Sequence, residues 1–266
     1  MIGPDARRGR LRPWVTTLLL VFSLAGAGCA TIADGDPSDP LEPWNRKVHA
    51  FNMALDEAVL APVARGYRDH VNPVFRMPIR SFFSNLEDIW ISANNLLQGK
   101  PVDAAQDLSR VMLNTTLGLF GLVDVASEIG FAKHREDFGQ TLGVWGVPPG
   151  PYIVLPFFGP SNGRDAIGFG VDSYGDPIGN VFKVSVDEAG ARTVRIIDER
   201  EALLNASKLL PGIALDEYSF IRDAYMQRRR SLVYDGDPPM LDEPAPRYDD
   251  EDDKDDKDDK PAKGSN

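Results

Sequence analysis

The stretch MPIRSFFSNLEDIWISANNLLQG, residues 77–99, decides the fold class. Its apolar residues recur every three or four positions, the spacing that places side chains on one face of an α-helix. Gly99 stands where a C-terminal helix cap is expected. The predicted apolar face is wide and rich in aromatic rings. It is made by Phe82, Phe83, Leu86, Ile89, Trp90, Ala93, Leu96 and Leu97.

Helical spacing recurs on both sides of this stretch. Residues 43–59 carry apolar side chains at steps of three or four, and Pro62 is expected to end that helix. A third pattern runs from Val102 into the apolar run 117–123, which is too short to cross a bilayer as a helix. Further helical patterns cover 194–204 and 215–232. The chain is therefore predicted to be mostly α.

Residues 137–180 have a different character. They are rich in Gly and Pro, with aromatic residues between them. Such residues interrupt regular structure, so we expect irregular backbone here, apart from a short strand at 152–155 between two prolines.

Composition excludes several classes of function. The 266 residues are 42% apolar, enough for a buried core. With 29 Lys and Arg against 40 Asp and Glu, the net charge of −11 argues against a nucleic-acid partner. One cysteine and three histidines far apart in the sequence disfavour a metal centre or a metal cofactor.

The N-terminal segment has the pattern of an export signal. Four arginines precede the apolar stretch 14–25, which is too short to span a bilayer and runs into small residues. We expect residues 1–28 to be a signal peptide that is removed. The pair Arg7-Arg8 leaves twin-arginine export open as an alternative.

Cys29, the only cysteine, directly follows the small residues at 25–28. This arrangement resembles the acylation site of bacterial lipoproteins, although Gly26 stands where that pattern prefers Leu. The resemblance implies a covalent lipid, N-acyl and S-diacylglycerol, on Cys29, and several chains on one residue anchor firmly. Ala30, in place of an aspartate, implies the outer membrane as destination. The alternative is an ordinary secretory signal with an incidental cysteine.

The remaining boundaries follow from composition. Residues 29–40 are small, polar and Pro-rich, as in a tether between a lipid anchor and a domain. Residues 41–235 hold the helical patterns. Residues 236–266 turn to Asp, Pro and Lys and end in an Asp-Asp-Lys repeat, so we expect a disordered acidic tail.

One motif suggests catalysis. Gly159-Pro160-Ser161-Asn162-Gly163 is a literal G-x-S-x-G, the pattern of a hydrolase nucleophile that would make Ser161 the catalytic residue of a lipase or esterase. That fold places its histidine after the serine, whereas the last histidine here is His134. Pro160 beside the serine favours an ordinary turn. We therefore expect no enzyme activity.

Several strings resemble the MlaA (VacJ) family of bacterial outer-membrane lipoproteins. Together they extend over residues 39–235, nearly the whole predicted domain. The strings are DPLEPWNR at 39–46, FN at 51–52, NNLLQGK at 94–100, NTTLGLFGLVD at 114–124, EDFGQTLGVWG at 136–146, GPYIVLP at 150–156 and GPS at 159–161.

The resemblance implies both a fold and a function. Members of this family are mostly helical rings lying in the inner leaflet of the outer membrane, lipid-anchored and facing the periplasm, and bound to trimeric porins. Mislocalised phospholipid leaves the outer leaflet through a polar channel, which maintains lipid asymmetry. The lipid then passes to a soluble periplasmic carrier, MlaC, and on to an inner-membrane ABC complex.

Two sets of residues become candidates for this function. Glycine density next to aromatic residues suggests a channel or gate at Gly118, Gly121, Gly139, Gly143 and Gly146. The wide apolar faces suggest membrane contact through Trp44, Phe51, Phe82, Phe83 and Trp90.

Alternatives remain for the function and for these aromatic residues. The aromatic side chains could instead belong to the core. The protein could also be a structural lipoprotein that organises porins and moves no lipid.

Overall fold

The computed structural model describes residues 39–182, 185–208 and 215–239. The predicted signal peptide, Cys29, most of the tether and most of the acidic tail lie outside these residues. Within them, no helix is both long enough and apolar enough to cross a membrane.

The described chain is mostly helical, with one two-stranded antiparallel sheet. η1 is a π-helix and η2 a 3₁₀-helix. The elements in chain order are α2 (Glu42–Leu55), η1 (Asp56–Leu60), α3 (Ala61–His70), α4 (Pro73–Leu97), α5 (Pro101–Thr116), α6 (Val125–Glu128), α7 (Phe138–Val144), β1 (Tyr152–Leu155), β2 (Gly159–Asn162), α8 (Gly163–Gly175), α9 (Ile178–Val181), α10 (Ser185–Leu203), η2 (Ala206–Lys208) and α11 (Glu217–Val233).

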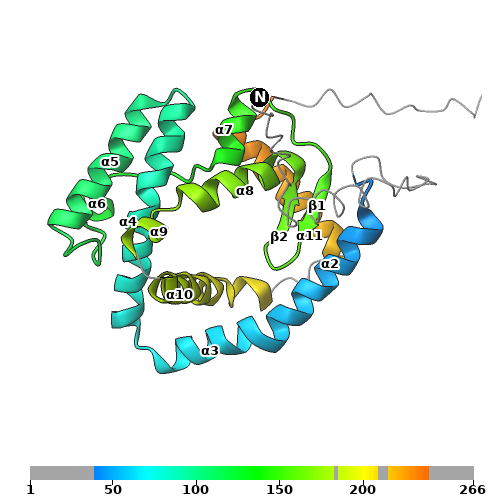
Figure 1. The fold of residues 1–266 in the computed structure, drawn as a ribbon, viewed down its shortest axis with the longest axis horizontal. Coiled ribbons are helices and arrows are strands. Elements are labelled where there is room, and N and C mark those ends of the chain that lie inside the picture. The colour runs from blue at the N-terminus through cyan, green and yellow to red at the C-terminus, as the bar shows by residue number, and fades with distance from the viewer. Residues whose placement is uncertain (1–38, 183–184, 209–214, 240–266) are drawn as a thin grey trace, which may run out of the picture.

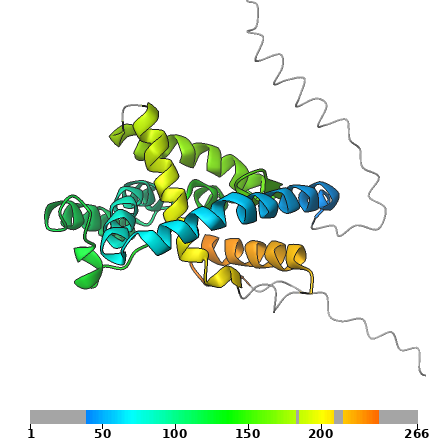
Figure 2. The same ribbon diagram turned by 90° about the horizontal axis from the view of Figure 1, so that it is seen from below.

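The elements follow one another around a flattened ring (Figure 1). α2, η1 and α3 form one long rod, α4 turns away from its end, and α5 packs along α4. α7 and α8 continue the ring, and β1 closes it against α2. α10 lies inside this outline, where it contacts α3 and α4, and it crosses the rod in the perpendicular view (Figure 2).

The prediction that Pro62 ends the first helix is wrong, because the rod continues to His70. The reason is the π-turn η1, in which the Ala61 amide donates to the Asp56 carbonyl, five residues back. This wider turn shifts the backbone register, so that Pro62 falls in the first turn of α3, where a missing amide proton is tolerated.

The expectation of irregular backbone over 137–180 holds at 145–151 and 156–158 and is wrong where α7, β2, α8 and α9 form. The predicted strand at 152–155 is confirmed as β1. Asp137 and Asn162 cap α7 and α8, since their side chains accept from the Gln140 and Asp165 amides at 2.8 and 2.9 Å. A Cβ on Gly168 would lie 2.5 Å from the Gly139 nitrogen. These glycines let two helices cross closely, so they do not act as breaks.

Other element boundaries differ less. α4 begins at Pro73 with the Asn72 side chain as its cap, and α10 begins at Ser185, earlier than its predicted pattern. α5 ends at Thr116, whereas the third pattern was expected to run on to Val123. The following turn has positive φ at Leu119, Phe120 and Gly121, which a helix cannot contain.

Polar residues outnumber apolar ones among the buried residues. Among the described residues, seventeen polar or charged residues are buried against thirteen apolar ones, and several of the latter are alanines. Thirty-six large apolar residues are exposed, including Phe120 at 78%. This reverses the usual partition of a water-soluble domain and leaves an outer surface suited to apolar surroundings.

Candidate functional site

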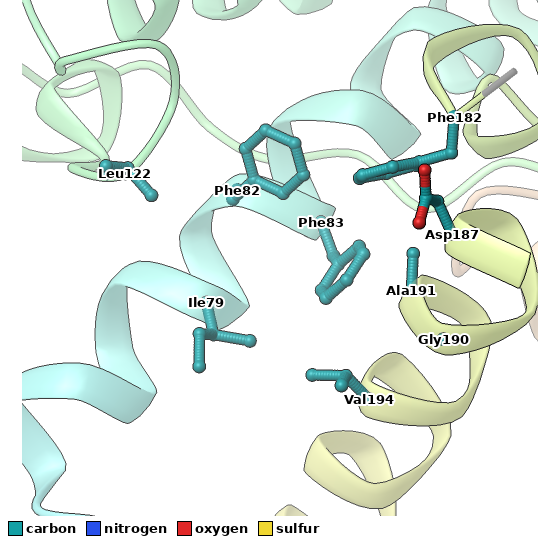
Figure 3. Close-up of a pocket in the computed structure, with 9 residues that line it drawn as sticks. All are labelled: Ile79, Phe82, Phe83, Leu122, Phe182, Asp187, Gly190, Ala191 and Val194. Carbon is teal, nitrogen blue, oxygen red and sulfur yellow. The ribbon is translucent and has the colours of Figure 1, made fainter. Parts of the chain in front are cut away.

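A cavity of about 550 Å³ lies between α4, α10 and the turn after α5. Figure 3 shows the phenyl rings of Phe82 and Phe83 on the α4 side, facing α10. Such a volume falls in the range of small-molecule sites, and the lining is apolar except for one carboxylate. The lining residues are Ile79, Phe82, Phe83, Leu122, Phe182, Asp187, Gly190, Ala191 and Val194.

The α10 wall of the cavity is built from small side chains. Gly190 and Ala191 lie one turn before Val194, so the helix presents little bulk opposite the phenyl rings. A Cβ on Gly190 would meet no atom within 4 Å. Asp187, in the first turn of α10, adds the carboxylate. The cavity therefore combines apolar walls with one charged group.

Phe82 joins the two sides of the cavity. Its ring packs edge-on against Phe83 with centroids 5.5 Å apart, and against Phe182 with centroids 6.4 Å apart. Phe182 follows α9, a hundred residues further along the chain. One wall of the site therefore comes from a helix that the sequence spacing predicts. The other wall comes from a segment about a hundred residues further along the chain.

Ion pairs hold α10 in position against the rod and α4. Arg200 donates to both carboxylate oxygens of Asp56 at 2.6 and 2.7 Å, and Arg80 donates to the buried Asp198 at 2.8 Å. Glu201 pairs with Arg76 and Arg80. Hydrogen bonds to their carboxylate partners raise the pKa of Arg80 and of Arg200. Charged groups therefore link α10 both to the rod and to α4.

The other wall is fixed by a buried network between α4 and α5. Arg110 donates to Asp88 at 3.1 Å and to Asp124 at 3.1 Å, and Lys133 donates to Asp88 at 2.6 Å. Burial raises the pKa of Asp88, against the effect of both cations. Asp124 also caps α6 by accepting from the Ser127 amide. This network positions the turn that carries Leu122.

The five predicted gate glycines fall into three places. Gly118 and Gly121 are buried in the turn beside the cavity, where a Cβ on Gly121 would collide with Asn85. Gly139 and Gly143 lie on α7 against α8 and α11, and a Cβ on Gly143 would lie 2.8 Å from Val233. Gly146 is in an exposed turn. Only the first pair adjoins the cavity.

The predicted membrane-contacting residues lie in two kinds of surroundings, exposed and half-buried. Trp44 and Phe51 are exposed on α2, at 56% and 48%. Phe82 and Phe83 are half-buried and line the cavity. Trp90 is half-buried, and its indole nitrogen donates to Asp172 at 2.7 Å.

Ser161 lies on β2, which pairs with β1. The prediction of a turn at this position is therefore wrong. The serine is 5% exposed, and its hydroxyl donates to the neighbouring Asn162 carbonyl at 3.3 Å. His134 is held by Asp107 at 2.9 Å, and His70 contacts the Gly66 carbonyl. Among the described residues, no histidine is hydrogen-bonded to Ser161, so the geometry gives no support to a serine hydrolase.

Sequence reasoning missed the α10 side of the site. Phe182, Asp187, Gly190 and Ala191 precede the spacing that predicted a helix from 194. The small pair Gly190-Ala191 one turn before Val194 is the signal that could have placed a thin wall there.

Comparisons with known proteins agree with this architecture. A family model described as the MlaA lipoprotein matches residues 37–232. The intermembrane phospholipid transport system lipoprotein MlaA of Escherichia coli strain K12 is 35% identical over 229 residues, covering 84% of this chain and 87% of that protein. Its counterpart of the same name in Haemophilus influenzae is 33% identical over 229 residues, covering 82% and 89%. An uncharacterized protein of Rickettsia felis is 36% identical over 197 residues, covering 73% and 78%.

A solved structure shares the fold. It comes from work on the structural basis for maintenance of bacterial outer membrane lipid asymmetry, and it matches with a TM-score of 0.63 at 36% identity. The match covers 74% of this chain and 99% of that one. Fold and site thus define this chain as a mostly helical, ring-shaped protein with many exposed apolar side chains.

The chain belongs to the MlaA lipoprotein family. The resemblance drawn from the sequence strings is confirmed, and so is the mostly α fold.

Proposed function

We propose that this protein removes mislocalised phospholipid from the outer leaflet of the outer membrane and so maintains lipid asymmetry. Two relatives are named as lipoproteins of an intermembrane phospholipid transport system, and the solved structure concerns outer-membrane lipid asymmetry. The observation that carries the proposal is the apolar cavity between α4 and α10.

The cavity suits the passage of acyl chains. Aromatic and small aliphatic side chains offer apolar contact, and burying each methylene is worth about 0.8 kcal/mol. Asp187 marks a polar end where a headgroup stays solvated. Passage from an unfavourable leaflet needs no energy from this chain, so no catalytic residue is required.

The proposal extends to the surroundings of the protein. The exposed apolar side chains would face the inner leaflet, and the lipid on Cys29 would hold the chain on the periplasmic side. A trimeric porin would be its membrane partner. Phospholipid would leave to a periplasmic carrier of the MlaC type, which feeds an inner-membrane ABC complex.

Filling the cavity tests the proposal. Gly190→Phe places a ring at a position where a Cβ would meet no atom within 4 Å. The substitution should not weaken the helix, because glycine has the lowest helix propensity of all residues except proline. The protein should be present at wild-type amounts in the outer membrane. Outer-leaflet phospholipid in a deletion strain that carries this variant should nevertheless stay near the level of the deletion strain.

Gly66→Phe is the matched control. Gly66 also lies in a helix with open space around its Cβ, but on α3 and away from the cavity lining. It should restore asymmetry as wild type does. Full restoration by Gly190→Phe as well would exclude this cavity as the path and favour a structural, porin-organising lipoprotein.

A further inference from the structure

A second cavity, of about 210 Å³, shares no lining residue with the first. It is lined by residues of the β1–β2 hairpin, α8, α11 and the start of α7. Its volume is below that of drug-sized sites, so it suits a small group. Neither the predicted gate glycines nor the predicted membrane residues line it.

The charges that line this cavity do not balance. Three carboxylates, Asp137, Asp165 and Asp172, line it together with one guanidinium, that of Arg229. Arg164, outside the lining, also pairs with Asp165 at 2.9 Å. Arg229 is engaged by the first two, donating to Asp137 Oδ1 at 2.9 Å and to Asp165 Oδ2 at 2.7 Å. Those hydrogen bonds, against burial, keep the pKa of Arg229 above its usual range. The guanidinium is thus committed to two carboxylates.

Asp172 is the carboxylate without a cation. Its Oδ1 accepts from the Trp90 indole at 2.7 Å and from the Phe138 amide at 2.9 Å. In the described part of the chain, no ion pair to Asp172 and no hydrogen bond to its Oδ2 is found. Burial raises the pKa of Asp172, and the neighbouring charge of Asp137 adds to this effect, against the hydrogen bonds from Trp90 and Phe138 and the charge of Arg229.

Aromatic rings complete the cavity. Phe158 and Phe169 pack with centroids 4.6 Å apart and an interplanar angle of 54°, and both are exposed. The Tyr225 phenol also lines the cavity and donates to Asp165 at 2.9 Å. Ring faces attract organic cations, and a carboxylate beside them supplies the opposite charge.

We propose that this cavity binds the ammonium group of an amino-headgroup phospholipid, with Asp172 as its partner and Phe158 and Phe169 as its aromatic walls. The inference rests on the proposed function and names the headgroup class that the protein takes. An ammonium there would satisfy Asp172 Oδ2 and reduce the charge imbalance.

Water-soluble short-chain lipids test this on the full chain in detergent. Dihexanoyl phosphatidylethanolamine and dihexanoyl phosphatidylglycerol share phosphate and tails. They differ in the headgroup, which carries an ammonium in the first lipid and two uncharged hydroxyls in the second. The indole signal of Trp90, labelled with nitrogen-15 and assigned with Trp90→Phe, reports on Asp172 because the two are hydrogen-bonded. The Trp145 indole, which donates to the Leu97 carbonyl, is the internal reference.

The ethanolamine lipid should bind wild type at least about tenfold more tightly than the glycerol lipid, the value of a hydrogen bond to a charged group. Asp172→Asn keeps an oxygen for Trp90 and Phe138 and should remove this preference. Phe158→Leu, at an exposed ring, should weaken ethanolamine binding about two- to fivefold, the range of an exposed cation–π contact. Asp69→Asn, on α3, should change neither lipid.

Three results would overturn the proposal: equal affinities in wild type, no shift of Trp90 with either lipid, or equal losses for both lipids in Asp172→Asn. Free ethanolamine separates the sources of the ammonium. Binding as tight as that of the lipid would assign the cavity to a soluble amine and overturn the headgroup reading. Failure of the proposed transport would show instead in the Gly190→Phe assay, which does not depend on headgroup preference.

Discussion

Arg110 has no exposed surface and is the residue around which the α4–α5 pair is organised. A buried guanidinium is tolerated only when carboxylates surround it, and Asp88 and Asp124 meet this need from two directions. Removing Asp88 would break a fully buried ion pair, at a cost of about 3–5 kcal/mol. Removing Asp124, whose side chain is 32% exposed, should cost less. The sequence shows these residues only as scattered charges on helical patterns.

Asp124 gives this network a pH dependence. Burial alone would raise its pKa, but hydrogen bonds from Ser127, Asn114 and Arg110 outweigh burial and lower the pKa to about 2. In the unfolded chain the Asp124 carboxyl has a pKa near 4. Between about pH 2 and about pH 4 the unfolded chain therefore binds more protons than the folded protein does. The stabilisation by Asp124 should therefore be complete above about pH 4 and be lost as pH falls towards about 2.

Denaturant unfolding of wild type and Asp124→Asn at a series of pH values measures this effect. The stability gap should be constant at neutral pH and close on acidification below about pH 4. Asp69→Asn, at an exposed side chain, should show no such closing gap. A gap that persists unchanged at low pH would mean that the charge of Asp124 contributes nothing.

At the scale of elements, the Asn45 side chain makes hydrogen bonds to β1 of the kind that a neighbouring strand would make. It is fully buried, donates to the Tyr152 carbonyl at 3.1 Å and accepts from the Val154 amide at 2.8 Å. Asn45→Ala should leave both backbone groups without a hydrogen-bond partner. The expected loss of stability is about 2–4 kcal/mol, measured by denaturant unfolding. Asn52→Ala removes an analogous pair of bonds nearer to solvent and should cost less. Equal losses would show that burial is not the cause.

Elements could be predicted where the signal is local. The spacing at 77–99, with Gly99 in the left-handed region as its cap, gave α4, and the spacing at 215–232 gave α11. α7 and α8 were missed because glycine was weighed as a helix breaker. Gly139 and Gly168 instead permit a close crossing, which depends on a partner helix that sequence spacing does not identify.

At the scale of the whole molecule, the cavity was beyond prediction for a similar reason. Phe82 and Phe83 were recognised as aromatic residues on a helix, with core and membrane left open. Their actual place depends on α10, whose approach is set by pairs such as Arg200–Asp56 across 144 residues. Long-range ion pairs leave no periodic trace in the chain, so the ring could be expected only from the family resemblance.

The reversed partition of polar and apolar residues leads to a prediction for the whole protein. If the outer surface faces lipid, association with membranes should not depend on the anchor alone. A Cys29→Ser variant, exported behind an ordinary cleavable signal, should still float with phospholipid vesicles in 1 M salt. At that ionic strength charge attraction is screened within about 3 Å, whereas apolar burial persists.

Adding Trp44→Asp and Phe51→Asp should release the protein, because each exposed ring is worth about 1.5–3 kcal/mol when fully buried. If the anchorless protein stays in the aqueous fraction, its apolar surface must instead be covered by a protein partner.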